Sequence, residues 1–158
     1  IEAGITIPAF SKKRKSLEHL MRVLGIDYGD VRIGVAISDP LGLTAQMLET
    51  IKWRNNTKVP VKRIGELIDA YHCEAIIVGI PRNMDGTSGE RERKTREFIK
   101  LLEHEFPETE IKSWDERLTT VMAQRAMHDM GVKAKNQKGR IDQMSAAFIL
   151  QGYLDFKR

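Results

Sequence analysis

The segment that most constrains the fold is 75–80, which contains no polar side chain. A run so short and so apolar is typical of a central strand that is covered by helices on both faces. Amphipathic helical patterns precede it, at about 58–71, and follow it, up to Phe106. Strands and helices that alternate in this way predict βαβ crossovers, and therefore parallel strands at the centre of a sheet.

Three predicted strands come before the first helix. Segments 22–27 and 32–39 are rich in apolar and β-branched residues and bracket a turn at Gly29, which predicts an antiparallel pair. A third strand with weaker alternation is expected within 43–53, and a fifth at 110–114. The order therefore predicts an α/β fold with one mixed five-stranded sheet flanked by helices.

Further boundary signals lie after the central strand. Thr87–Glu90 matches a capping box at the start of the helix that ends near Phe106. Two more helices are expected, at about 120–130 and 140–156, and a basic loop is expected between them, at 131–139.

The chain of 158 residues has the length of one domain. Residues 21–158 are predicted to form that domain, and 1–20, with their Lys-Lys-Arg-Lys run, a disordered leader or an expression tag. No apolar run approaches the roughly 18 residues that a membrane span needs. The single cysteine, Cys73, cannot form an internal disulfide and is expected in the core. These features predict a cytoplasmic protein without a membrane partner.

Positive charge is clustered in this chain, whose net charge is +4. One cluster consists of Arg91, Arg93, Lys94 and Arg96, and the other of Lys133, Lys135, Lys138 and Arg140. Such clusters favour binding to a polyanion, and nucleic acid is the usual one. The alternative is that both stretches only keep exposed surface soluble.

Three acidic positions are candidates for chemistry. Asp27 ends an otherwise apolar first strand, where a buried carboxylate is costly without a partner such as a metal ion. Asp115 and Glu116 follow the fifth strand, in the place where ligand sites of open α/β sheets gather. Asp142 lies in the first turn of the last helix, in line with small and apolar residues that are expected to face the sheet.

Each position also has a structural explanation. Asp27 could cap the turn that follows it, and Asp142 is favoured by the helix dipole without any function. Glu116 could pair loosely with Arg117 in a solvated turn. As a set, however, hard carboxylate oxygens from separate elements can hold one or two Mg²⁺ ions for phosphodiester cleavage. No Ser-His-Asp, Cys-His, zinc-ligand or P-loop pattern competes with this interpretation.

Four motifs occur together and in order: Gly-Ile-Asp-Tyr-Gly with Arg-Ile-Gly-Val-Ala in 25–36, Val-Gly-Ile-Pro-Arg-Asn-Met-Asp-Gly-Thr in 78–87, Asp-Glu-Arg-Leu-Thr-Thr in 115–120, and Ile-Asp with Ala-Ala and Ile-Leu-Gln-Gly-Tyr-Leu in 141–154. In these motifs the chain resembles the YqgF family, also called RuvX or pre-16S rRNA nucleases. The resemblance implies an RNase H-like fold similar to that of Holliday-junction resolvases. It also implies a nuclease that depends on Mg²⁺ or Mn²⁺ and matures the 5′ end of the small-subunit ribosomal RNA precursor.

The resemblance implies a site as well. The acids that match the family's catalytic and metal-binding positions are Asp27, Glu116 or its neighbour Asp115, and Asp142. Resolvases of the wider superfamily have an acid near the end of the fourth strand, where this chain has Gly79. The middle ligand is therefore open, and Asp85 in the nearby loop is a further candidate.

The expected partners are nucleic acids, either the ribosomal RNA precursor or branched DNA, together with ribosomal particles. The basic residues expected to contact nucleic acid are Arg32, Arg82, Arg91, Arg93, Lys94, Arg117, Lys133, Lys135, Lys138 and Arg140. A monomer or weak dimer is expected. The alternatives are a Holliday-junction-type DNA resolvase, a module that binds nucleic acid without cleaving it, and an actin-like ATPase, which would need two such domains.

Overall fold

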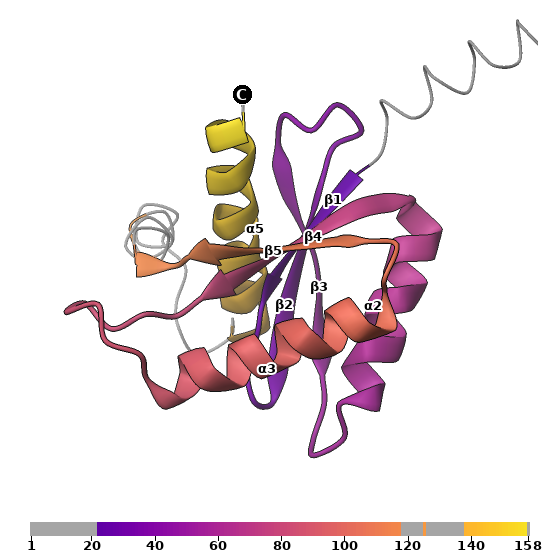
Figure 1. Ribbon diagram of the computed structural model, residues 1–158. Helices are drawn as coiled ribbons and strands as arrows, with labels where there is room; N and C mark the ends of the chain where they lie inside the picture. Colours follow the sequence, from indigo (N-terminus) through magenta and orange to yellow (C-terminus); the bar gives the residue numbers. More distant parts are fainter. Residues whose placement is uncertain (1–21, 118–124, 126–137, 158) are drawn as a thin grey trace, which may run out of the picture.

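The computed structural model describes residues 22–117, 125 and 138–157 (Figure 1). In chain order the elements are β1 (Arg22–Asp27), β2 (Arg32–Ser38), β3 (Ala45–Lys52), α2 (Lys58–Tyr71), β4 (Cys73–Ile80), α3 (Glu90–Glu105), β5 (Glu110–Asp115) and α5 (Lys138–Lys157). The strands form one sheet in the order β3-β2-β1-β4-β5. β1 pairs antiparallel with β2 and parallel with β4, so the predicted mixed sheet is confirmed.

Helices cover both faces of the sheet (Figure 1). Alternate residues of each strand point to opposite faces. Leu24 and Ile26 of β1 pack in the cluster under α2 and α3, whereas Val23 packs in the cluster under α5. β4 follows the same rule, which explains its unbroken apolar run: both of its faces are buried. Cys73 lies in the core, as predicted.

Glycines on the α5 face of the sheet allow the helix to approach the strands closely. A Cβ atom built on Gly34 of β2 would lie 2.0 Å from the backbone oxygen of Asp142. A Cβ atom built on Gly79 of β4 would lie 2.4 Å from Ile149 Cδ1. Both distances are far below a carbon contact distance, so neither position accepts a side chain without a shift of α5.

Gly34→Ala should lower the free energy of unfolding by about 2–3 kcal/mol, because the new methyl group overpacks the contact between β2 and α5. Urea unfolding of the pure protein measures this. Gly139→Ala is the matched control, since a Cβ atom there would be 3.5 Å from Thr50 Oγ1, an ordinary contact. Equal stability of Gly34→Ala and the unsubstituted protein would show that α5 does not rest against Gly34.

One expectation about the helices is wrong, and another lies outside the described residues. The capping box at Thr87–Glu90 is wrong: α3 begins after Gly89, with no side-chain cap, because the Thr87 hydroxyl donates instead to Asp85 Oδ1 at 2.6 Å. The helix expected at about 120–130 lies outside the described residues, apart from Arg125. Among the described helices, none is both long enough and apolar enough to cross a membrane.

Candidate active site

Two carboxylates meet at the carboxyl end of the parallel strands. Asp27 is the last residue of β1, and the alternation along that strand places its side chain on the α5 face. Glu116 follows β5 directly, and its backbone N–H donates to the Ile80 carbonyl at 3.0 Å, which extends the pairing between β4 and β5. Glu116 is buried. The structure thus brings the side chains of Asp27 and Glu116 together at this edge of the sheet.

Gly79 explains how Glu116 reaches this position. A Cβ atom built on Gly79 would lie 2.4 Å from Glu116 Oε1, so the carboxylate occupies the space beside a residue that has no side chain. The resemblance to resolvases leads to the expectation of an acid near the end of the fourth strand, where this chain has glycine. Here the neighbouring strand delivers a carboxylate to the same place.

Asp27 and Glu116 share a hydrogen bond. Burial raises the pKa of Asp27 well above its usual range, and the negative charges of Glu116 and Asp142 raise it further. Burial also raises the pKa of Glu116, while its hydrogen bond with Asp27 acts in the opposite direction. The bond raises the pKa of Asp27 and lowers that of Glu116, as expected for two carboxyl groups that share one proton.

Asp142 approaches this pair from α5 and is held by a different partner. Its charge acts on Asp27, yet Asp142 Oδ2 accepts from Arg32 Nε of β2 at 2.8 Å. The start of α5 lies directly against β2 at Gly34, which is the register partner of Asp27. The three predicted acids therefore share one corner of the fold, with Asp142 held in an ion pair.

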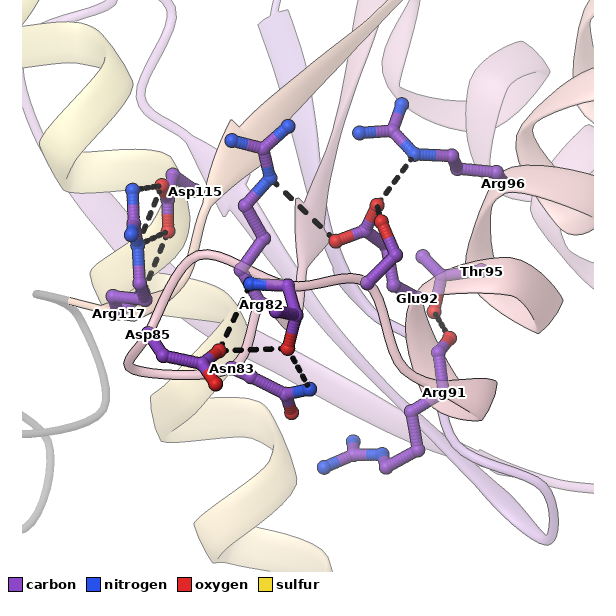
Figure 2. A network of polar contacts seen from close by, with 11 residues as sticks. Arg82, Asn83, Asp85, Arg91, Glu92, Thr95, Arg96, Asp115 and Arg117 are labelled. Carbon is purple, nitrogen blue, oxygen red and sulfur yellow. Dashed lines mark hydrogen bonds and ion pairs between the residues drawn. The ribbon is translucent and has the colours of Figure 1, made fainter.

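The two other candidate acids have different surroundings. Asp115 binds Arg117, whose Nε and Nη2 donate to Asp115 Oδ2 at 2.9 and 2.6 Å, and these contacts lower the pKa of Asp115. Asp85 is exposed in the loop before α3, where its Oδ1 accepts from the backbone N–H and the hydroxyl of Thr87 (Figure 2). Of the DER acids, Glu116 is therefore the one that faces Asp27.

A divalent cation fits part of this site. Two carboxylates that share a proton would release it to solvent when a cation binds, because a positive ion favours their charged forms. Asp27 and Glu116 would be its ligands, and Asp142 would join them on leaving Arg32. As the structure stands, no set of three histidine, cysteine, aspartate or glutamate ligands is gathered among residues 22–117, 125 and 138–157.

Among the described residues, Arg91 is a cation whose charge acts on both acids of the pair. Its charge lowers the pKa of both Asp27 and Glu116, although both remain raised overall. The side chain lies in the first turn of α3 and is exposed. Arg91 is therefore placed to contact an anion that reaches the carboxylates.

The other basic candidates differ in how far their charge is already neutralised. Arg93 pairs with both Glu90 and Glu97 along α3, and Lys94 Nζ lies 3.4 Å from Asp30 Oδ2. Arg140 is exposed at the start of α5. Lys133 and Lys135 lie outside the described residues, and Lys138 begins α5 with a side chain that is not described.

One buried acid was not among the candidates from sequence. The Glu92 side chain is only 4% exposed and lies between Arg82 and Arg96 (Figure 2). The spacing of Glu92 and Arg96, four residues apart in a helix, predicts an ion pair between them. It does not predict burial, which depends on the loop that brings Arg82 to the same carboxylate.

The raised pKa of Asp27 predicts how stability depends on pH. In the unfolded chain Asp27 loses its proton at a pH of about 4, whereas in the folded state without metal it keeps that proton to a higher pH. The free energy of unfolding should therefore fall as pH rises through the raised pKa of Asp27. Asp27→Asn should remove this contribution and should be the more stable protein at neutral pH. Urea unfolding of both proteins across a pH series measures the difference, and parallel curves would contradict the burial of Asp27.

Comparison with known proteins gives a consistent result. Residues 21–156 match the model of a family described as "RuvX: Holliday junction resolvase". A protein of Acetivibrio thermocellus is 60% identical over 137 residues, which are 87% of this chain and 97% of that protein. One of Ruminiclostridium cellulolyticum is 55% identical over 135 residues, or 85% of this chain and 94% of that protein. Both carry the name "Putative pre-16S rRNA nuclease".

Among solved structures, the fold is similar to that of RuvC of Thermus thermophilus in complex with a Holliday junction substrate. The TM-score is 0.53 and the sequence identity 18%, over 87% of this chain and 95% of that chain. The structure of Thermus thermophilus RuvC has the same TM-score of 0.53. The predicted RNase H-like fold is thus confirmed.

Proposed function

We propose that this chain, which belongs to the RuvX family of Holliday junction resolvases, is a nuclease whose hydrolytic site is the corner formed by Asp27, Glu116 and Asp142. Its family and its relatives support the hydrolysis of phosphodiester bonds. The dependence on a divalent metal ion and the assignment of the residues are our proposals.

The observation that carries the proposal is the carboxylate pair, in which Glu116 is buried and Asp27 is partly buried. Two acids held in contact at the end of a sheet are costly to ionise together, and a fold does not gain stability from such an arrangement. Acids with strongly raised pKa values in such positions are typical of functional sites. The pair also lies at the carboxyl ends of parallel strands, where open α/β sheets bind their ligands.

Two acids of the corner, Asp27 and Glu116, and the neighbouring Arg91 have separate proposed roles. A bound Mg²⁺ or Mn²⁺ would supply Lewis acidity toward the phosphate and lower the pKa of a water molecule. Asp27 and Glu116 would hold the ion through their carboxylate oxygens, once their shared proton has left. Arg91 would bind a nonbridging phosphate oxygen, since its side chain is exposed and its charge acts on both acids.

The substrate we propose is the precursor of the small-subunit ribosomal RNA, in the cytoplasm and on ribosomal particles. The names of the two bacterial relatives, more than half identical to this chain, support this choice. Branched DNA is the second candidate, because the description of the family names Holliday junction resolvases. We propose a monomer or weak dimer as the active form.

Cleavage assays on three labelled substrates test the proposal: a pre-16S ribosomal RNA fragment that spans the mature 5′ end, a four-way DNA junction, and a linear duplex of the same length. We expect cleavage of the RNA at or near the mature end with Mg²⁺ or Mn²⁺ and none in EDTA. Cleavage of the junction alone would favour the resolvase. The absence of cleavage for all three, with binding retained, would favour a module that only binds nucleic acid.

A further inference from the structure

A buried carboxylate with two arginines lies at the start of α3, next to the site but distinct from it. Glu92 Oε2 is 3.1 Å from Arg96 Nε of the same helix, and Glu92 Oε1 is 3.5 Å from Arg82 Nε in the loop after β4. The Ser88 hydroxyl donates to Glu92 Oε2 at 2.9 Å. The loop and the helix are therefore joined through one acid.

The two guanidinium groups use only their inner nitrogen toward Glu92. Figure 2 shows that the outer ends of both groups point away from the carboxylate. Within the described part of the chain, neither group donates its outer nitrogens to a protein acceptor. The Arg82 and Arg96 side chains are 41% and 46% exposed, so these donors face the surface.

The charges of this cluster leave it positive. Two arginines against one glutamate give a net charge of one positive unit, because Glu92 offsets only one of the two cations. Hydrogen bonds from Arg96 and Ser88, together with the positive charge of Arg82, hold the pKa of Glu92 below its usual range, so this carboxylate stays ionised at neutral pH. A second anion bound at the exposed side of the two arginines would neutralise the remaining positive charge.

We propose that Arg82 and Arg96 form a phosphate-binding site for the nucleic-acid backbone, and that buried Glu92 is the positioning residue that orients both of them. The paired planar forks match the geometry of a phosphate group better than single lysines would. The bound group is a phosphate other than the one that is cleaved, because Arg82 lies near Asp115 rather than the acid pair. This inference rests on the proposed function for its ligand.

Glu92→Gln is the sharpest test, because orientation and simple charge predict opposite results. Removal of a negative charge should strengthen the binding of a polyanion if only net charge matters. If Glu92 orients the arginines, glutamine can turn its amide oxygen toward only one of them and presents its NH2 donors to the other, so binding should weaken. We expect about fivefold weaker binding of a short single-stranded RNA and a salt slope smaller by about one.

The binding is measured by fluorescence anisotropy in EDTA, across a salt series, with a labelled RNA and a duplex DNA as probes. Glu103→Gln is the matched control, since it removes an exposed charge from the other end of α3 and should leave affinity unchanged or slightly higher. Arg82→Gln and Arg96→Gln should each weaken binding to a similar degree. Wild-type or tighter binding by Glu92→Gln would overturn the proposal.

Two further variants keep the test decisive if Glu92→Gln does not fold by circular dichroism. Arg82→Lys and Arg96→Lys retain the charge but lose the planar fork, so both should bind more weakly than the unsubstituted protein. Unchanged affinity of both would overturn the proposal, as would failure of the unsubstituted protein to bind either probe. The binding is measured without cleavage, so a failure of the nuclease proposal and a failure of this proposal give different results.

Discussion

Asp27→Asn should reduce metal-dependent cleavage by about 100-fold or more while the protein stays folded and still binds nucleic acid. Substitution of residues that only support metal ligands typically lowers metal affinity or activity by about 10–100-fold. Asp27 is proposed as a ligand itself, so its substitution should have at least that effect. Asparagine keeps the shape of the side chain and removes the negative charge that a cation needs. The measurement is single-turnover cleavage of the ribosomal RNA fragment at saturating enzyme.

The Asp27→Asn result has an internal control in stability. The same substitution removes a carboxyl group whose pKa is raised by burial, so the purified protein should be at least as stable as the unsubstituted one at neutral pH without metal. Loss of activity together with undiminished stability would assign the effect to chemistry. Undiminished cleavage by pure Asp27→Asn protein would show that another residue is the principal ligand.

Glu116→Gln should cause a loss of cleavage comparable with that of Asp27→Asn, of about 100-fold or more. Glu116 is buried against Gly79 and hydrogen-bonded to Asp27, so its charge acts directly on Asp27. The effect should appear in the rate of cleavage at saturating enzyme and in the Mn²⁺ concentration at half-maximal rate.

Asp115→Asn is the matched control for Glu116→Gln. The substitution changes an adjacent acid of the same strand end, but Asp115 binds Arg117 and is partly exposed. We expect a loss of less than about tenfold, as for an exposed ion pair that holds a nearby basic side chain. A larger loss for Asp115→Asn than for Glu116→Gln would reverse the assignment of the middle acid.

The strand and helix pattern could be predicted from the sequence because it depends on local periodicity. The apolar run of β4, the two runs around Gly29 and the helical spacing over 58–71 each signal their element within a few residues. The capping box at Thr87–Glu90 failed for a related reason. Its residues have the required chemistry, but the turn around Asp85 offers Thr87 a closer partner than the helix start does.

Two of the three acids could be found with little help from the tertiary structure. Asp27 stands out as a carboxylate at the end of an apolar strand, and Asp142 lies in line with residues that pack against the sheet, among them Ala146 and Ile149. The choice between Asp115 and Glu116 could not be made in this way. Adjacent residues point to opposite sides of a strand, and only the packing of the helices decides which side holds the site.

The sequence by itself therefore determined the α/β architecture, the edge of the sheet that carries the acids and the clustering of basic residues along the chain. The tertiary structure alone decided that Glu116 meets Asp27, that Arg32 holds Asp142, and that Glu92 joins Arg82 to Arg96. Local patterns arise from neighbours a few residues apart along the chain. Each of the first two contacts joins residues about 90 to 110 positions apart in the chain, and the third requires the loop after β4 to fold back on α3. These residues meet only because the register of the sheet and the docking of the helices bring them together.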